Sequence, residues 1–424
     1  MIKILKFNEV NKSEIFARAE GVSNVEQIVA EILEDVKANG DKAVLNYCER
    51  FDGAKLLSLQ VSEEEIQDAL NQVEPEFLRI LKRAASNITE FHKNQLREGF
   101  EIKKENGVIM GQKITPIEKV GLYVPGGSAA YPSTVLMDSI PAKIAGCSEL
   151  VITTPPDKEG KINPYILAAA YVAGVDKIFK TGGAQAVAAL AFGTESVPKV
   201  EKIVGPGNAF VAEAKRQVYG KVSIDMIAGP SEILVISDGK TNPAWTAADL
   251  LSQAEHDKNA SAVLITDSYE FALAVQKEID SQVKALERFE IASQSIDNNG
   301  KIIVTENLEE AVAVSNEIAP EHLELCVDDP FAYLPQIKNA GSIFLGRNCP
   351  EALGDYMAGP NHTLPTMGTA CFSSPLSVDD FVKKSQYTWF DAEAFADLAE
   401  DVAYFAKKEG LTGHAESALI RIRK

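Results

Sequence analysis

Short apolar segments alternate with longer amphipathic ones from about residue 149 to residue 346 of this 424-residue chain. A first run of predicted strands, within residues 149–238, is ELVITT, KIFKT, KIVG, SIDMIA and EILVISD. A second run, within residues 261–346, is SAVLIT, KIIVT, LELCV and SIFLG. The segments between them include GAQAVAALAFG, NAFVAEAKRQVYG and YEFALAVQKEIDSQVKAL, which have the length and apolar spacing of helices. Neighbouring parallel strands need such crossover helices, so the alternation predicts parallel sheets.

Two runs of this kind predict an α/β fold with two Rossmann-like domains, whose parallel sheets are flanked by helices, plus small helical N- and C-terminal segments. The first hundred residues are predicted to be helical. Their clearest helix, EFLRILKRAASNITEFHKNQ, has one apolar stripe at Phe77, Leu78, Leu81, Ala85, Ile88 and Phe91. The next segment, GVIMGQKITPIEKVGLYVP, is predicted to form two extended pieces around a turn at Pro116.

Charge and cysteine content exclude several classes of protein. Acidic residues outnumber basic ones by 61 to 42, a net charge of −19, which argues against a nucleic-acid partner because such binding needs Lys and Arg on the phosphates. No stretch reaches roughly 18 uninterrupted apolar residues, so no membrane span is expected. The five cysteines contain no C-x-x-C pair, which disfavours a disulfide framework or a thiolate zinc site. With too few apolar residues at the N-terminus for a signal peptide, we expect a cytoplasmic protein.

Four glycine-rich turns follow predicted strands. They lie at residues 124–134, 180–190, 203–210 and 227–232. Ligands of doubly wound sheets bind beyond the carboxyl ends of the strands, where glycine permits close approach and helix N-termini offer free N–H groups. None of the turns matches G-x-G-x-x-G, since Phe210 takes the place of a third glycine. Together they favour a dinucleotide or a phosphorylated ligand.

Seven residues of the sequence are candidates for a metal site. They form three pairs and one single position, namely Gln253 and His256, Glu321 and His322, Glu409 and His414, and Asp355. Nitrogen and oxygen donors of these types suit zinc or another borderline divalent ion. No H-E-x-x-H or C-x-x-C signature is present, so these residues alone leave a metal site and ordinary structural roles both open. His92 and His362 are interpreted as structural.

Nine motifs distributed along the chain resemble the histidinol dehydrogenase family. They are VGLYVPGG, TGGAQAVAALAFGTE, KIVGPGNAFVAEAKR, IDMIAGPSE, LLSQAEHD, APEHLEL, AGSIFLG, GPNHTLPT and GLTGHA. They occur in the family's order between about residues 25 and 420. The resemblance implies a four-electron oxidation of L-histidinol to L-histidine through L-histidinal, which uses two molecules of NAD. It also implies one divalent ion at each site, which is zinc in this family. It also implies a cytoplasmic homodimer with shared active sites, acting at the end of histidine biosynthesis.

The resemblance also implies a role for particular residues. The metal ligands would be Gln253, His256, Asp355 and His414. His322 would be the base for alcohol oxidation and Glu321 would activate water for the aldehyde step. Substrate contacts would come from Ser231, Gln253, His256, His322, Asp355, Glu409 and His414, and NAD contacts from Tyr123, Gln185 and Asn208.

The expected domains follow the same resemblance. They are an N-terminal helical segment (1–22), a discontinuous first α/β domain with the metal and catalytic residues (23–119 and 235–378), a second with the NAD-binding turns (120–234), and a helical tail (379–424) that reaches the neighbouring subunit.

Three alternatives remain at this level. A cysteine nucleophile would use Cys326, although it is better interpreted as a buried structural thiol, or Cys147, in a helix-to-strand turn. A related zinc- and NAD-dependent dehydrogenase would act on another small polar alcohol, such as a sulfonated diol. A catalytically inactive nucleotide-binding protein should have lost one of the acid–base or ligand residues, and none is missing. The identity of the metal, whether zinc, manganese or cobalt, stays open.

Overall fold

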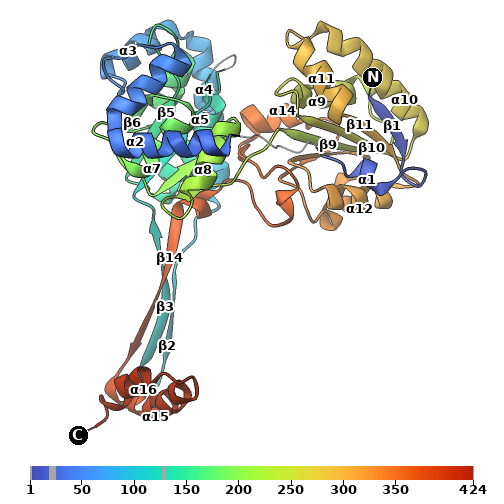
Figure 1. The fold of residues 1–424 in the computed structure, drawn as a ribbon. Helices are drawn as coiled ribbons and strands as arrows, with labels where there is room; N and C mark the ends of the chain where they lie inside the picture. The colour runs from blue at the N-terminus through green and yellow to red at the C-terminus, as the bar shows by residue number, and fades with distance from the viewer. Residues whose placement is uncertain (1, 19–24, 127–129, 424) are drawn as a thin grey trace. The chain divides into compact units, whose positions relative to one another are not determined.

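The computed structural model describes residues 2–18, 25–126 and 130–423. These residues form two compact units, one of residues 1–95 and 117–381 and the other of residues 96–116 and 382–424. The first unit contains two parallel sheets, and the second contains a three-stranded antiparallel sheet. The parallel sheets flanked by helices confirm the predicted α/β class (Figure 1).

The five-stranded sheet has the order β6-β5-β4-β7-β8, with all neighbours parallel. Its strands are β4 (Lys119–Tyr123), β5 (Glu149–Thr154), β6 (Lys177–Lys180), β7 (Lys202–Val204) and β8 (Ser223–Ile224). The chain winds outward from β4 to β6 and then returns to β7 on the other side of β4. The strand order therefore reverses between β4 and β7, and ligands of such sheets generally bind beyond the carboxyl ends at this point. The segment SIDMIA is a strand only over its first two residues.

Helices cover both faces of this sheet (Figure 1). One face carries α2 (Glu26–Tyr47), α7 (Gly183–Phe192) and α8 (Ala209–Val218). The other carries α3 (Glu63–Gln72), α4 (Pro75–Lys93), α5 (Pro132–Ala145) and α6 (Pro164–Ala173). The predicted domain boundaries grouped residues 23–119 with residues 235–378, whereas the helices of residues 26–93 pack on this sheet, and Asn87 of α4 also donates to the carbonyl of Met357. An apolar stripe predicts that a helix face is buried, but it does not predict against which sheet.

The six-stranded sheet has the order β1-β11-β10-β9-β12-β13 and is also parallel throughout. Its strands are β1 (Lys3–Lys6), β9 (Glu232–Ser237), β10 (Ser261–Thr266), β11 (Lys301–Val304), β12 (His322–Cys326) and β13 (Ser342–Leu345). One face packs on α9 (Pro243–Ala254), α10 (Tyr269–Gln282) and α11 (Phe289–Asn299), and the other on α1 (Lys12–Ile15) and α12 (Leu308–Ile318). Strand order reverses here between β9 and β12.

The N-terminal segment departs from the helical prediction for residues 1–22. Residues 3–6 form β1, which pairs in parallel with β11 from Lys3 beside Lys301 to Lys6 beside Val304. The short sequence KILK carries too few residues to show a period, and its place at the sheet edge is fixed by pairing with a strand nearly 300 residues away.

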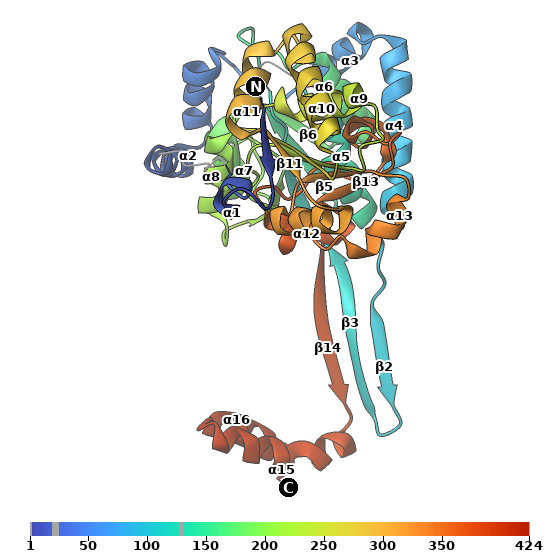
Figure 2. The same ribbon diagram turned by 90° about the vertical axis from the view of Figure 1, so that its right-hand side faces the viewer.

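The second unit contains the antiparallel strands β2 (Phe100–Lys104), β3 (Val108–Pro116) and β14 (Val382–Phe390), which run side by side (Figure 2). After them come α15 (Ala392–Lys408) and α16 (Thr412–Leu419). The prediction of a helical tail for residues 379–424 was therefore wrong at its start. Strand β14 is mostly exposed and is held by pairing with β3 along nine residues, so its sequence lacks the apolar run of a buried strand.

Short helical turns complete the described chain. They are η1 (Cys48–Asp52), η2 (Val283–Ala285), α13 (Pro330–Tyr333), η3 (Leu334–Gln336), α14 (Glu351–Leu353), η4 (Gly354–Ala358), η5 (Thr369–Cys371) and η6 (Val378–Phe381). Among the described residues, no helix is both long and apolar enough to cross a membrane. All five cysteines lie in described segments and are free thiols.

Candidate active site

The expected acid–base pair lies at the amino ends of two neighbouring strands. His322 is the first residue of β12 and stands beside Ile233 of β9, so Glu321 and His322 adjoin Ser231 and Glu232. Both strands begin with a polar residue and then become mainly apolar, in EILVIS and HLELC. The pair therefore lies at the end of the strand opposite to the usual ligand crevice of a parallel sheet.

The ring of His322 is buried and oriented by the main chain of β9. Its Nδ1 lies 3.0 Å from the carbonyl oxygen of Glu232, which can only accept, so Nδ1 carries the proton and donates it. The other nitrogen, Nε2, is buried without a hydrogen-bond partner and is the acceptor in the neutral form of the ring. Phe344 stacks against the ring at a centroid distance of 6.1 Å. The protein thereby selects the tautomer that a base acting through Nε2 requires.

Glu321 is held by the same residue of β9. Its Oε2 accepts the backbone N–H of Glu232 at 2.8 Å and lies 3.5 Å from His322 Nδ1. Burial opposes a charged imidazole, but the carboxylates of Glu321, Glu351 and Asp355 outweigh it and raise the pKa of His322 to about 10. Burial also raises the pKa of Glu232 to about 7, against the opposing charge of Arg18.

Two carboxylates face the free nitrogen of His322. Glu351 Oε1 lies 3.9 Å from Nε2 and Asp355 Oδ1 lies 4.0 Å from it. One ligand atom from each of these three side chains fits within 4.8 Å of the others, an arrangement able to hold a metal ion. Burial, reinforced by the charge of Glu351, raises the pKa of Asp355 well above its usual value, as expected where carboxylates crowd without a cation.

Glu351 was missed by the sequence analysis. It lies one turn before Asp355 across α14 and η4, its side chain is 2% exposed, and its Oε1 has no hydrogen-bond partner. Its Oε2 accepts the hydroxyl of Ser252 at 3.1 Å. The only signal in the sequence was a second carboxylate four residues before Asp355 in EALGD, a common helix-surface pattern.

The end of α9 supplies the next two expected ligands. Gln253 is buried, and His256 follows the helix with its Nδ1 2.9 Å from the carbonyl oxygen of Ser252. That contact fixes the proton on Nδ1 and leaves Nε2 for a ligand, the usual arrangement of a metal-binding histidine. Since Ser252 also binds Glu351, this end of α9 adjoins the carboxylate cluster.

His362, which the sequence analysis interpreted as structural, also belongs to this region. Burial and the neighbouring charge of His322 lower its pKa to about 4, and His256 acts in the same direction. Glu409 and His414 instead belong to the second unit, where they lie at the end of α15 and within α16, and both are exposed.

The thiol alternative finds no support in the described residues. Cys147 and Cys326 are both buried. Burial raises the pKa of Cys147 to about 11 and holds that of Cys326 well above its usual value. Neither thiol has the depressed pKa that an activated nucleophile requires.

The residues expected to contact NAD cluster around the crevice of the five-stranded sheet. Tyr123 ends β4, and its hydroxyl accepts the N–H of Gly183 at the start of α7, two residues before the buried Gln185. Asn208 caps α8 by accepting the N–H groups of Phe210 and Val211 through Oδ1, so its NH2 group takes no part in the cap. A pocket of about 420 Å³ is lined by Gly126 of the first glycine turn, by Pro155 after β5, and by residues of α3 and the start of α6.

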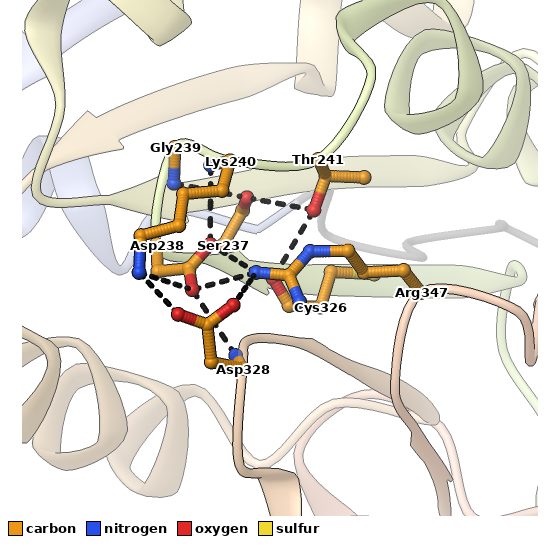
Figure 3. A network of polar contacts seen from close by, with 8 residues as sticks. All are labelled: Ser237, Asp238, Gly239, Lys240, Thr241, Cys326, Asp328 and Arg347. Carbon is orange, nitrogen blue, oxygen red and sulfur yellow. Dashed lines mark hydrogen bonds and ion pairs between the residues drawn. The ribbon is translucent and has the colours of Figure 1, made fainter.

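The carboxyl ends of β9 and β12, in contrast, are closed by ion pairs (Figure 3). Arg347 donates to Asp238 at 2.6 and 2.7 Å and lies 3.0 Å from Asp328. Lys240 pairs with Asp328 as well, and Thr241 donates to the carbonyl of Cys326. The side chains of this network are engaged with one another at the place where a ligand crevice would otherwise open.

Fold and site together define an α/β enzyme with two Rossmann-like sheets, a buried carboxylate–imidazole pair and a cluster of nitrogen and oxygen donors able to bind a divalent cation. Comparisons with known proteins narrow this class. The family model described as histidinol dehydrogenase matches residues 17–422. The chain is 53% identical to the histidinol dehydrogenase of Clostridium acetobutylicum over 428 residues, covering 100% of this chain and 99% of that protein.

Two further histidinol dehydrogenases are similar to this chain. The histidinol dehydrogenase of Syntrophotalea carbinolica is 54% identical, with 100% of both chains covered. The crystal structure of the histidinol dehydrogenase from Elizabethkingia anophelis superposes with a TM-score of 0.94 at 39% identity, covering 99% of this chain and 98% of that one. The chain therefore belongs to the histidinol dehydrogenase family of oxidoreductases.

Proposed function

We propose that this enzyme oxidises L-histidinol to L-histidine through L-histidinal, passing two hydrides to two molecules of NAD. The observation that carries the proposal is the main-chain clamp on the acid–base pair. Glu232 fixes the proton on His322 Nδ1 and holds the Glu321 carboxylate, which leaves Nε2 facing Glu351 and Asp355. Family membership supplies the substrate class.

The donor set fits zinc. His322 Nε2 and Glu351 Oε1 are buried polar atoms without hydrogen-bond partners, and the tautomer of His256 leaves its Nε2 available. We propose that Gln253, His256 and Asp355 hold the ion together with His414 from a second subunit, with Glu351 beside them. When bound, the ion supplies a positive centre that orients the amine and imidazole nitrogens of histidinol.

The groups of the chain then divide the proton transfers between them. His322 Nε2 accepts the hydroxyl proton as hydride leaves the alcohol carbon for the nicotinamide. A bound cation would offset the charges of Glu351 and Asp355, which together with Glu321 raise the pKa of His322 to about 10. Glu321 accepts a proton from the water that adds to the aldehyde carbon, and the hydrate loses the second hydride. Oε2 of Glu321 is already engaged by Glu232, so Oε1 is the acceptor.

The dinucleotide is assigned to the crevice at the carboxyl ends of β4 and β7. The supporting features are Tyr123, Gln185, Asn208 and the pocket beside Gly126, together with the N-terminus of α7 at two successive glycines. Bound there, NAD supplies the hydride acceptor. The N–H groups at the start of α7 suit its phosphates.

A metal analysis paired with a histidinol-dependent assay of NADH formation tests the proposal. We expect about two NADH per histidinol consumed and loss of activity on chelation, restored by zinc. A sulfonated diol and simple amino alcohols serve as competing substrates. Oxidation of the diol in preference to histidinol would contradict the assignment and favour a related dehydrogenase.

We further propose a homodimer in which Glu409 and His414 complete the partner's site. Both side chains are exposed on the second unit, and the same unit exposes large apolar residues, among them Trp389, Tyr404 and Phe405. Mixing and refolding inactive His256→Ala and His414→Ala chains should restore about a quarter of wild-type activity, because half of random dimers are hybrids with one intact site of two. Mixtures as inactive as the parents would place the whole site in one chain.

A further inference from the structure

A buried segment joins the candidate active site to the helix that follows the first glycine turn. Residues 361–363, in the sequence GPNHTLPT, run beside α5. Asn361 Nδ2 donates to the carbonyl oxygen of Met137 at 2.7 Å, and Thr363 Oγ1 donates to Asp138 Oδ1 at 2.9 Å. Asn361, Thr363 and Asp138 are all at most 5% exposed. His362, between the two contacts, lies with His322 in the candidate active site.

The sequence of α5 explains why this helix can accept such a contact. Pro141 lies inside the helix and has no N–H to give to the carbonyl of Met137 one turn earlier. An unpaired carbonyl in the buried interior is costly, and the amide of Asn361 satisfies it. The carbonyl of Met137 therefore depends on a hydrogen-bond donor from outside the helix.

Asp138 connects the same segment to the Gly205 turn (residues 205–208), which contains Asn208. Both backbone groups of Gly205 are held by a buried ion pair, since its N–H donates to Asp225 at 2.8 Å and its carbonyl accepts from Lys215 at 2.9 Å. A side chain at Gly205 would meet Asp138 Oδ2 at 3.2 Å, so this carboxyl oxygen packs against the turn. Oδ2 has no hydrogen-bond partner and is fully buried.

We propose that Asp138 and Thr363 are positioning residues for hydride transfer, which set the Gly205 turn, and with it the dinucleotide, at a fixed distance from the acid–base pair. The proposal rests on the proposed function, because it assumes that NAD lies at that turn. Neither residue touches the reacting atoms, so both act through the 361–363 segment and the turn.

The test compares Thr363→Val with Thr363→Ser. Valine matches the shape of threonine but leaves Asp138 Oδ1 without its donor, whereas serine keeps the hydroxyl. We expect Thr363→Val to lower kcat about tenfold, the effect of misplacing a hydride by a fraction of an ångström, with little change in KM for histidinol. The primary isotope effect with histidinol deuterated at the alcohol carbon should rise, because hydride transfer becomes slower relative to product release. Thr363→Ser should behave like the wild type.

A merely structural contact would give a different result. The thermal midpoint of Thr363→Val would fall while kcat and the isotope effect stayed at wild-type values, and that outcome would overturn the proposal. Asp138→Ala provides a second check through non-additivity. If both residues act through one hydrogen bond, the double variant loses no more activity than Asp138→Ala alone. Fully additive losses would also contradict the proposal.

Amide hydrogen exchange separates this inference from the proposed function. Thr363→Val should speed exchange at Gly205, Gly207 and Asn208 relative to Thr363→Ser, whatever the substrate is. If the wild type fails to oxidise histidinol but the exchange rates differ as expected, the proposed function fails and the link between segment and turn stands. Equal exchange in the two variants would remove the link itself.

Discussion

The two parallel sheets have the same kind of strand order, but their candidate site residues lie at opposite ends of the strands. In both, the chain winds outward from a central strand and returns on its other side, as β4 to β7 and as β9 to β12. Glycine turns, Tyr123 and a pocket lie at the carboxyl ends of the five-stranded sheet. The six-stranded sheet has Arg347 and its aspartates at the equivalent place, and the proposed acid–base pair lies at its amino ends. Topology offers a crevice, and the side chains placed there decide whether a ligand can enter it.

The largest expected effect tests which end of β12 is catalytic. His322→Gln at the amino end should lower kcat about 1,000-fold, the scale of losing a general base. Cys326→Ser, at the carboxyl end of the same strand, should remain close to wild type. Steady-state rates of NADH formation measure both. A severe loss in the folded serine variant would reverse the comparison and favour a thiol mechanism.

Removal of the Glu351 carboxylate should weaken metal binding. Glu351→Gln keeps the shape and the contact with Ser252 but removes one negative charge beside Asp355. We expect zinc affinity to fall about 10- to 100-fold, as measured by competition with a chromogenic chelator. Asp328→Asn, which removes a carboxylate from the ion pairs at the other end of the sheet, is the matched control. Unchanged affinity in Glu351→Gln would exclude this residue from the metal site.

The ion pairs at the carboxyl ends should contribute to stability and not to turnover. Arg347→Met removes the guanidinium that two carboxylates share, and the nearly buried Asp238 then keeps only the longer ion pair with Lys240 at 3.9 Å. The free energy of unfolding should fall by about 2 kcal/mol, determined by urea denaturation. At temperatures where the variant is folded, kcat should match the wild type. A large loss of kcat would mean that this end also takes part in the reaction.

The smallest effect concerns pH and the five-stranded sheet. Burial, with the nearby charge of Asp225, raises the pKa of Asp138 to about 8. Between about pH 4 and pH 8 the folded protein therefore keeps a proton that the unfolded chain has released, so this group makes stability fall as pH rises. Asp138→Asn removes that dependence. From pH 6 to pH 7 its unfolding free energy should gain about 1.4 kcal/mol relative to the wild type. A constant difference would place the pKa outside this range.

The sequence predicted the central strands well because buried parallel strands are continuous apolar runs between helices. EILVIS and SAVLIT are recognisable for that reason. β1 and β14 escaped because they are held by pairing at an edge, where side chains need not be apolar. The sheet on which α2–α4 pack could not be predicted, because an amphipathic stripe carries no information about its partner.

The candidate site was likewise predictable from the sequence only in part. Glu321 and His322 were predicted next to each other and lie next to each other, because two adjacent residues need no long-range fold to meet. Glu351 depends on a tertiary contact with His322, 29 residues earlier in the chain, and no local pattern marks it. The clamp by Glu232 was also unpredictable, since it uses main-chain groups that every residue possesses.

That clamp has a consequence for how the enzyme can change. The imidazole and the carboxylate are aligned by the peptide groups of residue 232, so at this position only proline, which lacks an N–H, would directly delete one of the two contacts. Transplanting the pair into another scaffold would require two whole neighbouring strands in this pairing, and grafting the two side chains alone would leave both the tautomer and the carboxylate unspecified.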